Sequence, residues 1–151
     1  HQGGFNFHQD NNYTLHDGAS CNCWIALGPC TKDNGCLQLV PHSHENGTVE
    51  SKAMFVDEHG NESHRTVAEA PETWDGIELE PGEAVLFSRL TVHGSGPNMT
   101  DDSRIAYAVQ FHRDDTTWYN PETKTWALLK DSQRWDVGPV SSFSDVVGVG
   151  E

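Results

Sequence analysis

The chain has 151 residues, which is enough for one domain with a sizeable core and indicates no second domain. A formal net charge of −14, with only nine Lys and Arg residues, excludes a protein that binds nucleic acid through a basic surface. Because no apolar run approaches the roughly 20 residues of a membrane helix, we predict a soluble chain that does not enter a membrane.

The first residues, His1-Gln2-Gly3-Gly4, include neither an initiator Met nor the apolar core of a signal peptide. We therefore expect the chain to be a processed or truncated piece of a longer protein. Its four cysteines, at positions 21, 23, 30 and 36, form no CxxC pair and no convincing zinc-ligand array. They are typical of small apolar residues in a reduced, cytosolic protein.

In chain order, the expected strands are short apolar segments separated by turns such as Asp33-Asn34-Gly35 and Glu80-Pro81-Gly82. No long apolar stripe with a 3.6-residue period predicts a major helix. The pattern favours an all-β sandwich or small barrel that spans residues 1–151 as a single domain. The predicted strands cover residues 4–8, 21–27, 36–40, 84–87 and 105–111.

Two other stretches are expected to be irregular. Residues 45–75 are polar and acidic and contain Gly47, Gly60 and Pro71, which predicts a long insertion loop over one end of the domain. Residues 136–151, with Gly138, Pro139 and Gly148, predict an irregular tail.

His8-Gln9-Asp10 is the first motif that carries chemistry. Residues two apart in a strand point to the same face, so His8 and Asp10 can reach one interior point, and His93 supplies a third ligand. Two imidazoles and one carboxylate leave three positions open on an octahedral ion, which suits Fe(II) binding a bidentate cosubstrate and O2. A chain with nine His produces such a pair by chance, so His residues without a metal are the alternative.

Arg104 adds to this pattern because it follows His93 by eleven residues, on the next strand-like segment. A guanidinium buried in a barrel needs an anionic partner, and the distal carboxylate of 2-oxoglutarate meets that need in a bidentate pair. Ser95 can add a hydroxyl to the same carboxylate. A structural salt bridge is the alternative for Arg104.

These motifs, in their order and spacing over residues 4–113, resemble the phytanoyl-CoA dioxygenase family. The resemblance implies a double-stranded β-helix (jelly-roll, cupin-like) fold with Fe(II), 2-oxoglutarate and O2. The matching segments are His8-Gln9-Asp10, Trp24-Ile25-Ala26-Leu27, Asn34-Gly35-Cys36-Leu37, Val40-Pro41-His42-Ser43-His44, Pro81 to Phe87, and His93-Gly94-Ser95 through Arg104.

The resemblance also implies roles for single residues. His8, Asp10 and His93 are then the iron ligands, and Arg104 and Ser95 hold the cosubstrate carboxylate. Trp24 matches a position beside 2-oxoglutarate, although ordinary core packing is an equal alternative. Related halogenases have a small residue where Asp10 stands, so the carboxylate favours hydroxylation.

The chain departs from the family at two places. His42 stands where the family's turn has a glycine, which puts the geometry of that turn in question. Family members also carry a long region before the HxD strand, including helices, that has no counterpart here. We therefore expect this chain to be the C-terminal part of a longer family fold.

The sequence thus predicts an Fe(II)- and 2-oxoglutarate-dependent hydroxylase that acts on a C–H bond of a small or lipid-like substrate and releases succinate and CO2. Desaturation or ring formation stays open. The alternatives are a non-catalytic jelly-roll binding module and a cupin-type metalloenzyme that does not use 2-oxoglutarate. Five residues that share a strand face with a site residue or follow the metal strand are predicted substrate contacts, with solvated loop or plain packing as the alternative: Asn6, Asn11, Tyr13, His16 and Gln110.

Overall fold

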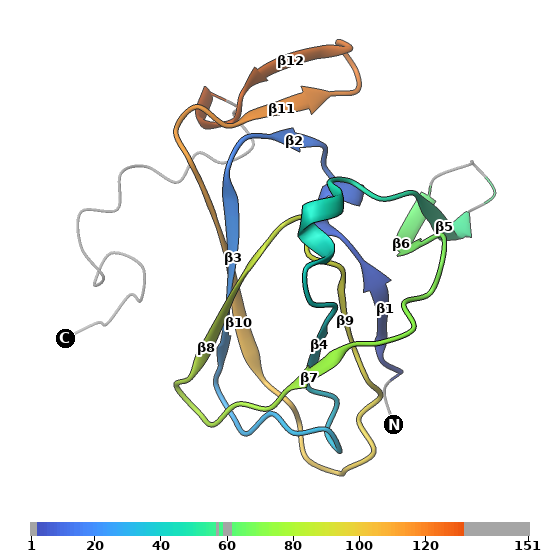
Figure 1. Ribbon diagram of the computed structural model, residues 1–151, viewed down its shortest axis with the longest axis vertical. Helices are drawn as coiled ribbons and strands as arrows, with labels where there is room; N and C mark the ends of the chain where they lie inside the picture. Colours follow the sequence, from blue (N-terminus) through green and yellow to red (C-terminus); the bar gives the residue numbers. More distant parts are fainter. Residues whose placement is uncertain (1–2, 57, 59–61, 132–151) are drawn as a thin grey trace.

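The computed structural model describes residues 3–56, 58 and 62–131. Two antiparallel sheets face each other, and a smaller sheet and a hairpin lie at their margins (Figure 1). The elements are β1 (Phe5–His8), η1 (Asp10–Asn12), β2 (His16–Asp17), β3 (Ser20–Ala26), β4 (Leu37–Leu39), η2 (Ser43–Asn46), β5 (Ser51–Val56), β6 (Glu62–Val67), β7 (Asp75–Ile77), β8 (Ala84–Ser88), β9 (His93–Ser95), β10 (Ala106–His112), β11 (Thr117–Asn120), β12 (Thr125–Leu128) and η3 (Leu129–Asp131), where η marks a 3-10 helix.

The two main sheets have the strand orders β1-β9-β4-β7 and β10-β3-β8. The central strand of the second sheet shows how the sequence builds these layers. In β3 the side chains of Asn22, Trp24 and Ala26 are buried, while those between them are only partly buried. This period of two turns one face of the strand toward the opposite sheet, as expected for a β-sandwich.

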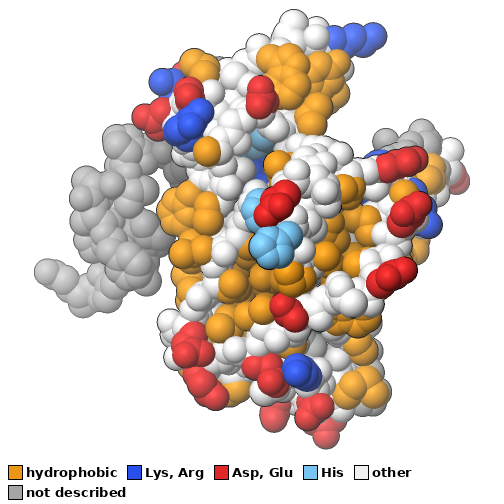
Figure 2. All heavy atoms as spheres, in the orientation of Figure 1, with side chains coloured by type: hydrophobic (Ala, Val, Ile, Leu, Met, Phe, Trp, Pro, Cys, Tyr) orange, Lys and Arg blue, Asp and Glu red, His pale blue; other side chains and the backbone are white. Residues whose placement is uncertain are grey.

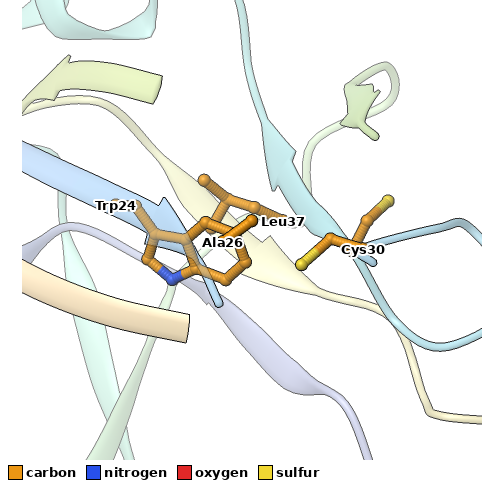
Figure 3. Close-up of a cluster of buried hydrophobic side chains, with 5 residues drawn as sticks. Trp24, Ala26, Cys30 and Leu37 are labelled. Carbon is orange, nitrogen blue, oxygen red and sulfur yellow. The ribbon is translucent and has the colours of Figure 1, made fainter. Parts of the chain in front are cut away.

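The apolar core lies between the sheets. Figure 3 shows Trp24 and Ala26 of β3 beside Leu37 of β4, with Cys30 close to them. Cys36 completes this cluster, and both Cys30 and Cys36 are buried free thiols. They therefore act as small apolar core residues. Removing an apolar side chain such as that of Leu37 from water contributes about 1.5–3 kcal/mol to folding.

The predicted all-β jelly roll is confirmed, and each of the five predicted apolar segments contains a strand. The prediction of a loop over residues 45–75 is wrong, because β5 and β6 pair there as an antiparallel hairpin. Met54, Phe55 and Val56 are exposed on this hairpin, so the sequence of β5 does not alternate between apolar buried and polar exposed residues. Backbone hydrogen bonds between β5 and β6 hold the two strands together. The predicted tail, residues 136–151, lies outside the described residues.

The turn at His42 keeps the backbone shape that a glycine would adopt. His42 has φ 59° and ψ 0°, in the left-handed region that is costly for residues with a Cβ. Ser43 follows, donates its hydroxyl to the carbonyl of Val40 at 2.7 Å and accepts the amide of Val92 at 2.8 Å. These bonds tie η2 to the segment just before His93, so the turn supports the β9 strand.

Acidic side chains dominate the charged groups on the face in Figure 2, where hydrophobic side chains gather near the middle and red groups line the lower edge. The excess of acidic groups agrees with the net charge of −14 of the whole chain. In the part of the chain that the structure describes, no helix has the length and apolar character to cross a membrane.

Candidate metal centre

Strand register brings the two histidines together. His8 and His93 are cross-strand partners in β1 and β9, both side chains are buried, and their ring centres lie 4.3 Å apart. The Nδ1 atom of His8 lies 2.8 Å from the carbonyl of Asn6, and that of His93 lies 2.9 Å from the carbonyl of Thr91. A carbonyl only accepts, so both Nδ1 atoms carry the hydrogen, and both Nε2 atoms present a lone pair for a metal.

Asp10 reaches the same point because the chain stays extended beyond β1. Gln9 has φ −111° and ψ 143°, which places Asp10 on the His8 side of the strand before η1 begins. Asp10 Oδ1 lies 3.7 Å from His8 Nε2 and 3.6 Å from His93 Nε2. Within residues 3–56, 58 and 62–131, these three make the one group of potential metal ligands, with ligand atoms within 4.8 Å of one another.

The other carboxylate oxygen of Asp10 is held by the opposite sheet. Asn22 of β3 donates its side-chain amide to Oδ2, and Gln110 of β10 donates its own amide to the same oxygen at 3.0 Å. Asn22 and Gln110 are cross-strand partners in β3 and β10, so both side-chain amides reach Asp10 from the same side. Only Oδ1 therefore faces the histidines, which suits a ligand that donates a single oxygen.

The protonation state of His8 also suits a metal ligand. Burial, reinforced by the nearby His93, lowers the pKa of His8 to about 4. The side chain is then neutral at physiological pH and needs no deprotonation before it donates its lone pair to a metal.

Gln9, between the two ligands, has a structural role that the sequence reasoning missed. Its side chain is fully buried, donates to the carbonyls of Gly47 at 2.9 Å and Leu90 at 2.6 Å, and accepts the amide of Val49 at 2.9 Å. The sequence offered one signal of this role: Gln9 lies between His8 and Asp10, so its side chain points to the other face of the strand. These bonds fix the extended backbone that aligns His8 with Asp10.

Arg89 is a second residue that the sequence reasoning missed. It lies between β8 and β9, only 3% of its surface is exposed, and burial lowers the pKa of its guanidinium. It donates to Gln110 Oε1 at 2.8 Å and to the backbone carbonyls of Asp10 at 3.2 Å and Thr14 at 2.9 Å. Its place four residues before His93, in a segment that is otherwise poor in charge, was the only signal in the sequence.

Arg104 lies just before β10, at the other end of the sandwich interior. Its guanidinium carbon is 5.3 Å from the centre of the Trp24 ring, a cation–π distance. It lines a cavity of about 310 Å³ together with Ser95 and the acidic residues Asp101 and Asp102. Among the residues that the structure describes, no carboxylate forms an ion pair with Arg104.

Ser95 and Trp24 were predicted to contact the cosubstrate, and the structure places both near Arg104. Ser95 is two residues after His93 in β9, and its Oγ accepts the backbone amide of Phe5 at 3.2 Å, which leaves the hydroxyl hydrogen free to donate. Trp24 packs in the apolar core and also lies under Arg104. The structure thus brings Ser95, Trp24 and Arg104 together, and their role in cosubstrate binding stays a prediction.

Three of the five predicted substrate contacts lie beside the candidate metal ligands. The exposed Tyr13 ring is 5.6 Å from the ring of His8. Asn6 is exposed on β1, and its side-chain nitrogen lies 2.6 Å from Met54 Sδ. Gln110 bonds to Asp10, as described above. Contact with a substrate stays a prediction for each.

The two remaining predicted contacts have packing partners. Asn11 is buried, donates to Thr48 Oγ1 at 2.9 Å and accepts the amide of His16 at 3.0 Å. The ring of His16 lies 5.0 Å from that of His112. Burial, and then the positive Arg89, lowers the pKa of His16 to about 4. These contacts give both residues a structural role, and a substrate role for them stays untested.

Comparison with curated proteins places the fold and the triad in context. The phytanoyl-CoA dioxygenase (PhyH) family model matches residues 1–106. A probable phytanoyl-CoA dioxygenase of Caenorhabditis elegans is 30% identical over 82% of this chain and 41% of that protein. Phytanoyl-CoA dioxygenase 1 of Oryza sativa subsp. japonica is 31% identical over 82% of this chain and 43% of its own length. The chain thus spans less than half of these relatives.

Solved structures share the fold. EvdO2 of Micromonospora carbonacea var. aurantiaca, solved with 2-oxoglutarate, superposes with a TM-score of 0.63 and 24% identity over 86% of this chain and 49% of that one. The apo form of the non-heme monooxygenase ThoJ also has a TM-score of 0.63 and 24% identity, over 75% of this chain and 41% of its own. With the family model matching residues 1–106 and a His-Asp-His triad that fits iron, the chain belongs to the phytanoyl-CoA dioxygenase family of Fe(II)/2-oxoglutarate-dependent oxygenases.

Proposed function

We propose that this chain carries the catalytic centre of an Fe(II)- and 2-oxoglutarate-dependent hydroxylase that acts on a C–H bond of a small or lipid-like molecule. The observation that carries the proposal is the convergence of His8 Nε2, His93 Nε2 and Asp10 Oδ1, with all three atoms within 4.8 Å of one another. We also propose that residues 1–151 act as one domain and that the protein is cytosolic, in keeping with its four free thiols.

The donor set supports iron. Two neutral imidazoles and one carboxylate are the ligands of non-haem Fe(II) oxygenases, and they leave open positions for a chelating cosubstrate and O2. When bound, Fe(II) with 2-oxoglutarate and O2 supplies an oxidant for C–H bonds and yields succinate and CO2. Asp10 fills the third protein position, which favours hydroxylation over transfer of a bound halide.

The rest of the site binds and orients. Arg104 faces a cavity without a carboxylate ion-pair partner among the described residues, and the distal carboxylate of 2-oxoglutarate supplies the missing anion. Ser95 donates its free hydroxyl hydrogen to the same carboxylate. Trp24 is buried in the apolar core, and its ring lies against the guanidinium of Arg104, which helps to orient that side chain.

The surroundings of His8 suggest the class of substrate. Phe5 and Tyr13 have ring centres 4.8 and 5.6 Å from the His8 ring, and both are more than 40% exposed. Met54 on the hairpin is exposed to a similar extent and touches Asn6. This apolar rim suits a hydrocarbon group, and nine Lys and Arg in the whole chain make an acyl-CoA with several phosphates a less suitable substrate.

The test uses anaerobic protein, Fe(II) and 2-oxoglutarate. The chelate should give a weak visible charge-transfer band, and O2 should then produce succinate, whereas Asp10→Ala should give neither. Absence of both the band and succinate in the wild-type protein would contradict the proposal and favour a non-catalytic binding module. Metal binding that 2-oxoglutarate does not alter would instead favour a cupin-type enzyme.

A further inference from the structure

Arg89 contacts Asp10 by two routes. Its Nη2 atom donates to the backbone carbonyls of Asp10 and Thr14, which holds the start of η1. Its Nη1 atom donates to Gln110 Oε1 at 2.8 Å, and Gln110 Nε2 donates to Asp10 Oδ2 at 3.0 Å. One residue outside the triad therefore fixes both the backbone and, through Gln110, the carboxylate of Asp10.

The chemistry of these groups determines how the Gln110 amide is oriented. A guanidinium only donates, so Arg89 can face only Oε1, and an ionised carboxylate only accepts, so Asp10 can face only Nε2. Asn22 offers a comparison, because its amide also donates to Asp10 Oδ2 but its own Oδ1 is buried without a hydrogen-bond partner among the described residues. Gln110 is thus held at both ends, whereas Asn22 is held at one.

The burial of Arg89 is costly and needs an explanation. Only 3% of the residue is exposed, and within the described part of the chain its guanidinium forms no ion pair. Its bonds to the backbone carbonyls of Asp10 and Thr14 hold the loop. The bond to Gln110 is a further one, and it directs the positive charge toward the carboxylate of a metal ligand.

We infer that Arg89 is a positioning residue of the metal centre, which acts through Gln110 to hold Asp10 so that only Oδ1 faces His8 and His93. This inference rests on the proposed metal site and extends it to residues that are not ligands. Removing a hydrogen-bond partner of a metal ligand commonly weakens metal binding by roughly 10- to 100-fold. The Arg89–Gln110 pair is therefore expected to set both the affinity and the geometry of the site.

The experiment compares Gln110→Met, Arg89→Met and the double variant, with Co(II) alone as the probe. Calorimetry gives the Co(II) affinity and visible absorption reports the ligand field. We expect each single variant to bind Co(II) about tenfold or more weakly, with a changed spectrum. Because Arg89→Met already removes both the direct support of Asp10 and the support that passes through Gln110, the double variant should be hardly weaker than Arg89→Met, so the effects should not add.

Arg113→Met is the matched control. Arg113 follows β10 directly, its side chain is 63% exposed, and it pairs with Asp115 rather than with the metal site, so Co(II) binding should not change. Circular dichroism checks the fold, and Gln110→Met keeps the test decisive if Arg89→Met does not fold. Wild-type affinity and spectrum in Gln110→Met would overturn the inference. Wild-type protein that binds no Co(II) would overturn the proposed function itself, and the inference with it.

Discussion

The guanidinium carbon of Arg104 lies 5.3 Å from the centre of the Trp24 ring, so this cation packs against a side chain of the apolar core. Arg104→Met should keep much of this packing and lose the charge. Because charge-assisted hydrogen bonds contribute about 1.5–3 kcal/mol, the affinity for 2-oxoglutarate should fall about 10- to 100-fold. Calorimetry on Co(II)-loaded protein measures this affinity.

Binding of Co(II) itself should be unchanged in Arg104→Met, since Arg104 is not a ligand. Arg113→Met again serves as the control for the loss of one positive charge. If Arg104→Met bound 2-oxoglutarate as tightly as the wild-type protein, Arg104 would have no part in cosubstrate binding.

Asp10→Ala should remove the metal site. The variant loses the only oxygen ligand of the triad, so Co(II) affinity should fall by more than about 100-fold, beyond the usual effect of an outer hydrogen-bond partner. Asp17→Ala on β2, an exposed carboxylate, is the control and should bind Co(II) normally. Equal Co(II) affinity in the two variants would refute the triad.

His42→Gly should stabilise the protein. The left-handed backbone of His42 costs about 1–2 kcal/mol in a residue with a Cβ, and glycine removes this cost. Glycine also has greater freedom in the unfolded chain, which cancels part of the benefit, so the free energy of unfolding should rise by about 0.5–1 kcal/mol. The exposed contact between His42 and Glu45 contributes little in comparison. Urea unfolding measures the difference, and His44→Gly, within η2, should destabilise instead. A loss of stability in His42→Gly would show that the turn is not strained.

The metal-free protein should lose stability as the pH falls from about 6.5 toward 4. In the folded state burial lowers the pKa of His16 from 6.5 to about 4, so in this window the unfolded chain binds more protons and acid favours unfolding. His16→Phe keeps a ring against His112 but takes up no proton, so its stability should depend less on pH. Urea midpoints at pH 7 and 5 measure this, and identical pH dependence in both proteins would contradict the assignment.

The sequence by itself determined the features that depend on local pattern. Short apolar segments between turns predicted all-β structure, because alternation within four to seven residues already places one face of a strand in the core. His8-Gln9-Asp10 predicted two ligands on one face for the same reason, and the structure shows Gln9 extended between them. His93 and Arg104 were predicted from their chemistry and from their spacing of eleven residues, and the order of the family motifs then supported both.

Only the tertiary structure decided which distant residues support these ligands. Gln110 is a hundred positions from Asp10, and Arg89 is 79 positions away, so their contacts depend on how the β10-β3-β8 sheet faces β1 and β9. The β5–β6 hairpin was missed because Met54, Phe55 and Val56 of β5 are exposed and its backbone pairing carries no alternating signal. Local chemistry therefore predicted the candidate ligands, whereas the partners that hold them come from contacts across the two sheets, which a linear pattern does not encode.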